Sequence, residues 1–255
     1  MNKILINADD FGLFDSGNSG IVRAFNENLI SSTTACANGE FIEQAFKLAC
    51  ENGFSDKIGI HINLTEGTPL TDKIKSDSFF CKDGVFHGQI NRLKKPTQEQ
   101  LRELRDEVSA QIQRLKDIGF NLTHADSHHH IHTCVFFEDT IKDVLFKYGI
   151  NKIRLHRNFG DIRFYKKIVK NWYNKKLRKQ GFITTEKMGS LFDLEKYPDT
   201  AKKFLCEIMV HPDLDKNGEV VDRIDWDKAG CPCGEKLSEI KKYIGNCKLI
   251  SYGDI

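Results

Sequence analysis

Residues 3–10 are Lys-Ile-Leu-Ile-Asn-Ala-Asp-Asp, a short apolar run that stops at two adjacent carboxylates. A run of this kind is typical of a buried strand. A helical pattern near Gly20–Ile30 and a second strand pattern near Ser32–Ala37 follow it. A strand, a helix and a strand in this order predict a βαβ unit and therefore a parallel sheet.

The same alternation continues along the chain. Further strand patterns lie near Lys57–Asn63, Leu122–Asp126, Lys152–Leu155, Phe182–Thr185, Glu207–Val210 and Lys248–Tyr252. Helical patterns lie near Phe41–Glu51, Gln98–Ile118, Phe136–Tyr148 and Tyr165–Gln180. Seven or eight mostly parallel strands predict an α/β fold of the (β/α) barrel type, with a doubly wound open sheet as the alternative. A chain of 255 residues, 40% of them hydrophobic, is expected to form one domain over residues 1–255.

The helix over Gln98–Ile118 has the clearest boundaries. Thr97 and Gln100 form a capping box before it, and Gly119 follows its last residue. Its apolar positions form one stripe: Leu101, Leu104, Val108, Ile112, Leu115 and Ile118. Such a stripe must pack against the core. The segments Thr65–Lys95 and Asp213–Cys233 lack a clean period, so we expect two irregular excursions there, the second with a turn at Lys216-Asn217-Gly218.

The composition excludes several classes of partner. The 38 basic residues nearly balance the 36 acidic residues, for a formal net charge of +2, so nucleic acid is not expected as a partner. No apolar stretch is long enough to span a bilayer, and the N-terminus does not resemble a signal peptide, so we expect no membrane partner. The eight cysteines lack the dense spacing of a disulfide scaffold, which predicts unpaired thiols in a reduced, cytoplasmic protein.

Acids and histidines are concentrated at the predicted strand ends. They are Asp9-Asp10, His61, Asp126-Ser127-His128 and His211. In a (β/α) barrel, functional side chains come from the C-terminal ends of several strands. This distribution therefore favours the barrel over the open sheet.

The strongest functional signal is the histidine-rich segment Thr123–His132. Extended geometry would place four of its side chains on one side: Asp126, His128, His130 and His132. Histidine is a common metal ligand, and an acceptor such as Asp126 can fix the tautomer of a ligating imidazole. A solvated histidine run is the weaker alternative, because strand and helix patterns flank the segment.

Asp10, His61 and His128 together supply one carboxylate and two imidazoles from three strand ends. Three protein ligands leave coordination positions open for water and substrate, which is typical of a catalytic metal site. We therefore predict one divalent ion here. This donor set suits Zn²⁺, Mn²⁺, Fe²⁺ or Ni²⁺ better than Mg²⁺. Taken alone, His61 would more often be a hydrogen-bonded core histidine than a metal ligand.

Three further residues are candidates for catalysis. Asp9 lies beside the predicted ligand Asp10, and two adjacent carboxylates can be separated by their surroundings into a base and a ligand. Arg154 could pair with Asp9 and hold it ionised, and His211 could act as an acid or a base. Structural alternatives remain open for each: a turn pair, an exposed salt bridge and a packing histidine.

Four ordered motifs together resemble the YdjC-like carbohydrate deacetylases, and in particular the chitooligosaccharide (diacetylchitobiose) deacetylases. The motifs are Asn7–Gly12, Gly59–His61, Asp126–His132 and Met209–Pro212. The resemblance covers essentially the whole chain and implies a distorted (β/α) barrel, a divalent metal ion, often Mg²⁺, and removal of acetate from N-acetylglucosamine units. By motif, the metal ligands fall on Asp10, His61 and His128, the base on Asp9 and the acid on His211.

The resemblance implies a small acetylated oligosaccharide as the partner, and a homodimer is left open. Two other functions stay in view. One is a phosphoesterase on the same scaffold, which would normally need two metals or a clamp of basic side chains. The other is a catalytically silent protein that binds sugar or metal.

Overall fold

The computed structural model of the chain describes residues 2–88, 90, 92, 94–226, 228 and 230–255. Its main sheet has seven strands in the order β6-β3-β2-β1-β8-β7, with β12 pairing to the start of β1. All of these pairs are parallel, so the predicted parallel α/β sheet is confirmed. The strands are β1 (Lys3–Phe11), β2 (Ser32–Ala35), β3 (Ile58–Ile62), β6 (Ala125–Ser127), β7 (Lys187–Ser190), β8 (Cys206–Val210) and β12 (Lys248–Leu249).

The seven strands form a half-barrel that single bridges continue. Ala125 in β6 pairs in parallel with Ile153, and Lys152 pairs in parallel with Ile183. Ile183 lies four residues before β7, so backbone pairing runs from β6 towards β7 around a distorted barrel.

Two expected strands are wrong in detail. Lys152–Leu155 and Phe182–Thr185 make isolated bridges, and the regular strand lies at Lys187–Ser190. The Thr184 hydroxyl donates to the Thr185 carbonyl, and the Thr185 hydroxyl donates to the Lys187 carbonyl. Local bonds of this kind compete with a strand ladder.

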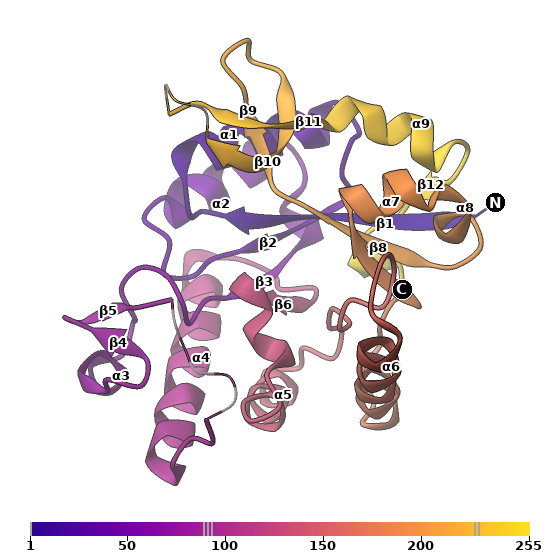
Figure 1. Ribbon diagram of the computed structural model, residues 1–255. Helices are drawn as coiled ribbons and strands as arrows, with labels where there is room; N and C mark the ends of the chain where they lie inside the picture. The colour runs from indigo at the N-terminus through magenta and orange to yellow at the C-terminus, as the bar shows by residue number, and fades with distance from the viewer. Residues whose placement is uncertain (1, 89, 91, 93, 227, 229) are drawn as a thin grey trace.

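Helices surround the sheet (Figure 1), with α1 and α2 on one side and α4, α5 and α6 in succession on the other. The longer helices are α1 (Asp15–Asn26), α2 (Ile42–Glu51), α4 (Gln98–Ile118), α5 (Glu138–Lys147) and α6 (Phe164–Lys179). The shorter ones are α3 (Asp72–Ser76), α7 (Leu191–Lys196), α8 (Pro198–Ala201) and α9 (Ile240–Ile244), with 3-10 turns at Ser55–Lys57, His128–Thr133, Leu237–Glu239 and Tyr252–Asp254. Within the described residues, no helix combines the length and apolarity needed to cross a membrane.

Helix α4 confirms its predicted boundaries and also positions a loop of the site. The capping box at Thr97 and Gln100 is present, and Gly119 ends the helix in the left-handed region. Two polar side chains of α4 are fully buried. Glu107 accepts hydrogen bonds from the backbone of Leu70 and Thr71, and Gln111 bonds both backbone groups of Asn63. The loop after β3 is therefore fixed to α4.

The two excursions differ from expectation. Thr65–Lys95 contains α3 and a short hairpin of β4 (Cys81–Lys82) and β5 (Val85–Phe86), while Gln89, Asn91 and Leu93 lie outside the described residues. The expectation of an irregular Asp213–Cys233 segment is wrong. It belongs to a three-stranded antiparallel sheet of β9 (Pro212–Leu214), β10 (Val220–Trp226) and β11 (Pro232–Lys236).

The predicted turn between β9 and β10 explains this sheet. The Asp215 carboxylate accepts from the backbone amides of Asn217 and Glu219, and Gly218 has a φ of +75°. Glycine adopts this backbone conformation readily. The turn brings the β-branched residues at the start of β10 back against β9. The predicted free thiols are present at Cys36, Cys50, Cys81, Cys134, Cys206, Cys233 and Cys247.

The α4 stripe predicts the cost of losing its packing. Leu104 is fully buried, whereas Leu101 on the same face is partly buried. We expect Leu104→Ala to lower the free energy of unfolding by about 2–5 kcal/mol, because it leaves a cavity in the core. Leu101→Ala is the matched control and should cost less. Urea denaturation of both variants measures the difference, and equal losses would contradict this packing of α4.

Candidate active site

The C-terminal ends of β1, β3, β6 and β8 meet at one cavity of about 420 Å³. Five predicted residues line it: Asp9, Asp10, His61, His128 and His211. Its other lining residues are Phe14, Glu66, Ser127, His129, His130, Met209, Arg223 and Ile224. The sixth predicted residue, Arg154, is fully buried and supports the site from within the barrel.

Arg154 holds Asp9 in a bidentate ion pair. Its two terminal nitrogens donate to the two Asp9 carboxylate oxygens, each at 2.6 Å. Burial raises the pKa of Asp9, but the guanidinium outweighs burial, and the pKa lies well below its ordinary value. Asp9 is therefore a carboxylate at neutral pH. The pairing expected from the sequence is present.

The same guanidinium holds two further carboxylates. A terminal nitrogen lies 2.7 Å from Asp126 Oδ2, and Nε donates to Glu207 Oε1 at 2.6 Å. Burial raises the pKa of Glu207, which also accepts a 2.6 Å hydrogen bond from the Tyr252 hydroxyl. Sequence reasoning missed Glu207. The available signal was its position inside β8. An acid in a buried strand needs a cationic partner.

Asn7 is a second support for Asp9 that the sequence did not indicate. Its amide nitrogen lies 3.0 Å from Asp9 Oδ1 and 3.2 Å from Thr34 Oγ1. Its amide oxygen faces His124 Nε2 at 3.1 Å. Asp9 is thus held from two directions, and its carboxylate has little freedom to turn.

The backbone explains how two adjacent aspartates reach one cavity. Successive side chains of a regular strand point to opposite faces. The pairing of β1 with β2 shifts register between Ala8 and Phe11, and Asp10 has a φ of +68°. This left-handed conformation is strained for a residue other than glycine. The expectation that the strand stops before Asp9 is wrong, since β1 continues through this irregularity to Phe11.

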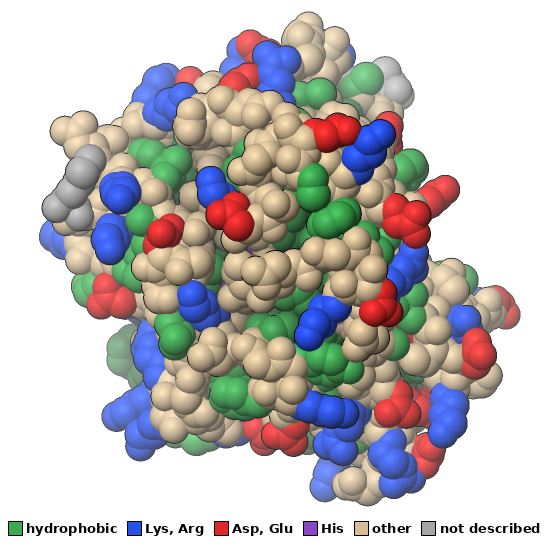
Figure 2. All heavy atoms as spheres, turned by 180° about the vertical axis from the view of Figure 1, so that it is seen from behind, with side chains coloured by type: hydrophobic (Ala, Val, Ile, Leu, Met, Phe, Trp, Pro, Cys, Tyr) green, Lys and Arg blue, Asp and Glu red, His purple; other side chains and the backbone are tan. Residues whose placement is uncertain are grey.

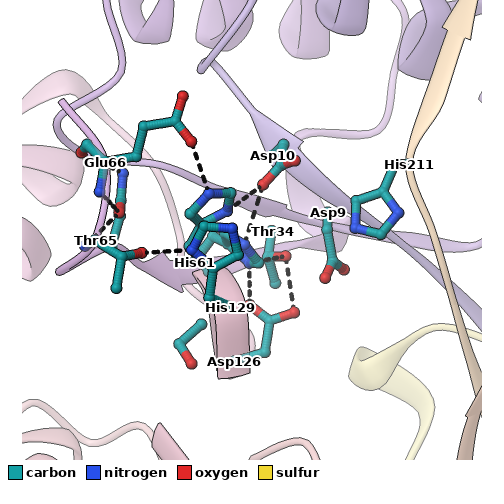
Figure 3. A network of polar contacts seen from close by, with 12 residues as sticks. Asp9, Asp10, Thr34, His61, Thr65, Glu66, Asp126, His129 and His211 are labelled. Carbon is teal, nitrogen blue, oxygen red and sulfur yellow. Dashed lines mark hydrogen bonds and ion pairs between the residues drawn. The ribbon is translucent and has the colours of Figure 1, made fainter. Parts of the chain in front are cut away.

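Asp10 has partners different from those of Asp9. Its Oδ1 lies 3.2 Å from His61 Nε2 and 2.8 Å from His128 Nδ1. Burial raises the pKa of Asp10, but the two imidazoles outweigh burial and hold it well below its ordinary value. In Figure 3, the Asp10 carboxylate turns toward the imidazoles, whereas Asp9 lies beside His211. The two carboxylates are therefore directed to separate tasks.

His61 lies between two carboxylates. Its Nδ1 lies 2.7 Å from Asp126 Oδ1, so the other ring nitrogen faces Asp10. Burial lowers the pKa of His61, but Asp126 and Asp10 outweigh it and raise the pKa to about 10. An imidazole nitrogen and a carboxylate oxygen at 3.2 Å are both acceptors unless a proton or a cation lies between them. The pair is therefore suited to hold a cation.

His128 has the same kind of environment. Its Nε2 lies 3.0 Å from Glu66 Oε2, while Nδ1 faces Asp10. The bond to His128 lowers the pKa of Glu66. Sequence reasoning missed Glu66, because it comes from the loop that α4 fixes after β3.

The expectation that four side chains of the histidine segment share one side is wrong. Strand β6 ends at Ser127, and a 3-10 turn begins at His128. His129 and His130 both have left-handed backbone angles, with φ of 50° and 54°. His130 lines the cavity, where burial lowers its pKa to about 3, whereas His132 is buried and bonds Ser127 Oγ.

His211 directly follows β8, as expected, and its Nδ1 lies 3.6 Å from Asp222 Oδ1 in β10. Asp222 also accepts the backbone N–H of His211 at 2.7 Å. Burial lowers the pKa of His211, but Asp222, Asp10 and Asp9 raise it above its ordinary value. The imidazole is therefore able to carry a proton at neutral pH.

Arg223 of β10 forms a wall that the sequence did not reveal. Its guanidinium lies 3.4 Å from Asp10 Oδ2 and 3.0 Å from Asp213 Oδ2. The same group lies over the rings of Phe14 and Trp226, at 4.8 and 5.4 Å from their centroids. These contacts keep it at the cavity, in contact with the aspartate that also faces His61 and His128.

The sequence of the chain is similar to those of several known proteins. Residues 3–239 match the family described as YdjC-like protein. A chitooligosaccharide deacetylase of Salmonella paratyphi B is 39% identical over 134 residues, 52% of this chain and 51% of that protein. A carbohydrate deacetylase of Vibrio campbellii is 36% identical over 131 residues, 51% of this chain and 50% of that protein. The aligned part thus spans about half the length of these two relatives.

Two other relatives are similar over more of the chain. A carbohydrate deacetylase of Xenopus laevis is 28% identical, with 82% of this chain and 80% of that protein aligned. A crystal structure of a proposed cellobiose-phosphate cleavage protein from Enterococcus faecalis has a TM-score of 0.73 and 21% sequence identity. It covers 100% of this chain and 99% of that chain, which shows a shared fold.

The donor set around Asp10 fits a divalent cation. Donor atoms of Asp10, Cys36 and His61 lie within 4.8 Å of one another. A second such group, around the same imidazole, is formed by Asp9, His61 and Asp126. His128 contacts the same Asp10 oxygen from another side. Buried carboxylates and imidazoles that face one another require a proton or a metal to compensate them.

The third ligand can be tested directly, since Cys36 and His128 both lie near Asp10. Burial raises the pKa of the Cys36 thiol well above its ordinary value, which opposes the thiolate needed for coordination. We therefore expect His128→Ala to lose bound metal and Cys36→Ala to retain it. Elemental analysis of the two purified variants measures this. Retention of metal in His128→Ala, together with its loss in Cys36→Ala, would assign the third ligand to the thiol.

Proposed function

Because the chain belongs to the YdjC-like protein family, we propose that it is a metal-dependent carbohydrate N-deacetylase. It would release acetate from N-acetylglucosamine-containing oligosaccharides such as diacetylchitobiose. The observation that carries the proposal is the separation of Asp9 and Asp10, which are neighbours in sequence but have different partners. Asp9 is held in a bidentate ion pair by Arg154, whereas Asp10 faces the two imidazoles of His61 and His128 and only the edge of the Arg223 guanidinium, which suits a metal ligand.

Asp10, His61 and His128 would hold one divalent ion. When bound, this ion supplies a Lewis acid that polarises the acetamide carbonyl. The resemblance suggests Mg²⁺, whereas a carboxylate with two imidazoles suits Zn²⁺ or another transition metal better. Asp126 supports this assignment, since it accepts from His61 Nδ1 and leaves Nε2 directed at Asp10.

Asp9 would take the proton from the attacking water. The ion pair with Arg154 keeps Asp9 ionised, so its carboxylate is in the form that can accept a proton. The pair also fixes the direction of the carboxylate, which favours proton transfer in a single geometry. Arg154 acts here as a positioning residue, because it is buried behind Asp9.

His211 would protonate the leaving nitrogen. Collapse of the tetrahedral intermediate breaks the C–N bond, and an amine leaves readily only when it is protonated. His211 lines the same cavity beside Asp9, and its raised pKa keeps a proton available. The products are acetate and a free glucosamine unit, with the water oxygen in the acetate.

The cavity walls suit a sugar. Polar edges come from Glu66, His130 and Arg223, and apolar surface comes from Phe14 and Ile224. Sugar rings present both hydroxyl edges and apolar faces. The volume of about 420 Å³ is within the usual range for small-molecule sites.

The phosphoesterase alternative has weaker support. Among the described residues that line the cavity, Arg223 is the only arginine or lysine, and Asp10 and Asp213 already contact it. A phosphoryl group would need a stronger clamp or a second metal. A silent binding protein is separated from the enzyme by acetate release alone.

The two aspartates give the decisive test. Asp9→Asn keeps the size of the side chain but accepts no proton, so it should bind metal nearly normally while turnover falls by about two to four orders of magnitude. Asp10→Asn should lose metal and activity together. Acetate release from diacetylchitobiose and bound metal are measured for both variants. Asp143→Asn, at an exposed position of α5, is the control and should behave as wild type.

Near-normal turnover of Asp9→Asn would remove the proposed base. If both aspartates were turn formers, asparagine would replace either one without loss of activity. Acetate release absent from the unmodified protein, with metal bound, would instead favour the silent binding protein.

The pH dependence tests His211. Asp222 raises the pKa of His211, so Asp222→Asn should lower it while the amide oxygen still accepts the backbone N–H. A general acid is active when protonated, and a lower pKa means that it loses its proton at lower pH. We expect the alkaline limb of the kcat–pH profile to move to lower pH in Asp222→Asn. An alkaline limb at the wild-type position would assign that limb to another group.

A further inference from the structure

The first half of α6 carries an exposed apolar face. Five large side chains are each more than half exposed: Phe164 (79%), Tyr165 (57%), Ile168 (54%), Val169 (52%) and Trp172 (60%). They follow i, i+4 spacing in two adjoining rows, so they form one stripe along the helix. We call these five residues the apolar stripe. Contiguous exposed apolar surface of this kind usually marks an interaction site.

The opposite face of α6 binds the body of the protein. Asn174 accepts the backbone N–H of His156 and donates to its carbonyl, and the rings of Tyr173 and His156 stack at 5.1 Å. Leu177 is buried one turn further along. On a helix of 3.6 residues per turn, Asn174 and Leu177 lie on the side opposite the apolar stripe, whereas Tyr173 lies at its edge, one turn after Val169. The stripe therefore points away from the fold.

The helix is also strongly basic. Between Asp161 and Glu186 there is no acidic residue, while residues 163–179 include eight lysines and arginines. The other 30 basic residues of the chain are outnumbered by its 36 acidic residues, so the rest of the chain is net acidic. Over most of the face shown in Figure 2, acidic and basic side chains lie interspersed. The charge of the chain is thus polarised toward α6.

An apolar stripe flanked by lysines could be covered by a second copy of the chain or by an anionic surface. Pairing of two α6 helices through their stripes would bring two strongly basic helices together, which is unfavourable even though Lys176 is paired with Asp139. An anionic lipid surface matches both features, because aromatic and aliphatic side chains enter the interface while lysines contact the headgroups. Charge complementarity therefore favours the lipid surface.

We propose that α6 docks the protein on an anionic lipid surface, with the apolar stripe at the boundary between headgroups and acyl chains. The helix lies on the membrane and does not cross it, consistent with its length and charge. The proposal departs from the expectation of no membrane partner, which considered a spanning segment and a signal peptide and did not consider a surface helix. None of the described residues that line the catalytic cavity comes from α6, so docking is independent of the proposed reaction.

Vesicle flotation at low salt tests the proposal on the full chain. The protein should float with vesicles of phosphatidylcholine mixed with phosphatidylglycerol, and stay behind with phosphatidylcholine alone. The double variant Phe164→Ser and Trp172→Ser should lose most of the binding. Lys175→Ala and Lys179→Ala should each weaken it about fivefold. Phe192→Ser, at another exposed apolar position, and Lys82→Ala, at an exposed lysine of β4, are the matched controls and should bind as wild type.

Fluorescence gives a second readout at the stripe itself. The chain has two tryptophans, so Trp226→Phe leaves Trp172 as the single reporter. Its emission should shift to shorter wavelength on anionic vesicles, as the indole leaves water.

Three results would overturn the proposal. The first is failure to float with the anionic vesicles at low salt. The second is flotation that survives the double serine change, which would show a nonspecific effect of positive charge. The third is a dimer that the serine changes dissociate and that does not bind vesicles, which would assign the stripe to a second copy. Acetate release plays no part in these measurements, so failure of the proposed reaction leaves them unaffected.

Discussion

The rest of the site depends on one fully buried guanidinium. Arg154 contacts Asp9 of β1, Asp126 of β6 and Glu207 of β8, all within 2.7 Å, so a single cation connects three strands. Three carboxylates could not share so small a buried volume without it, because each would lose its hydration with no compensation. Removal of one partner leaves a buried charge without compensation. This destabilises the fold far more than replacement of the whole cluster by apolar side chains. The stability of this part of the barrel and the electrostatics of the site therefore have the same origin.

This arrangement also links the two tasks proposed for the site, proton transfer and metal binding. Arg154 fixes Asp9 directly, and it fixes His61 indirectly, because Asp126 lies between the guanidinium and the His61 ring. The proposed base and a proposed metal ligand are thus oriented by one residue. The irregularity in β1 is the other requirement. Without the left-handed angle at Asp10, adjacent aspartates would point to opposite faces of the sheet, and only one of them could reach the cavity.

What the sequence could predict follows from how local each signal is. The boundaries of α4, the βαβ order and the acids and histidines at strand ends are recorded in neighbouring residues, and the structure has them as predicted. Glu66 and Arg223 escaped prediction because their positions depend on distant partners: the α4 side chains that fix the loop after β3, and the antiparallel sheet that carries β10. The histidine segment was misjudged for a related reason. The left-handed backbone angles of His129 and His130 break the extended pattern that would have aligned alternate side chains. No local sequence motif predicts these angles.

Residues at the strand ends and residues of the connecting segments would have different effects on substrate choice. The proposed ligands, base and acid lie at or directly after strands of the main sheet, whereas Glu66 and Arg223 come from the segments that connect them. Loops and added hairpins can change while a barrel keeps its strand ends. Relatives that share the strand-end residues can therefore keep amide hydrolysis and differ in the sugar they accept. By this argument the sugar preference proposed for this chain would depend on the walls formed by Glu66, Arg223 and Ile224, more than on the five residues that would perform the reaction.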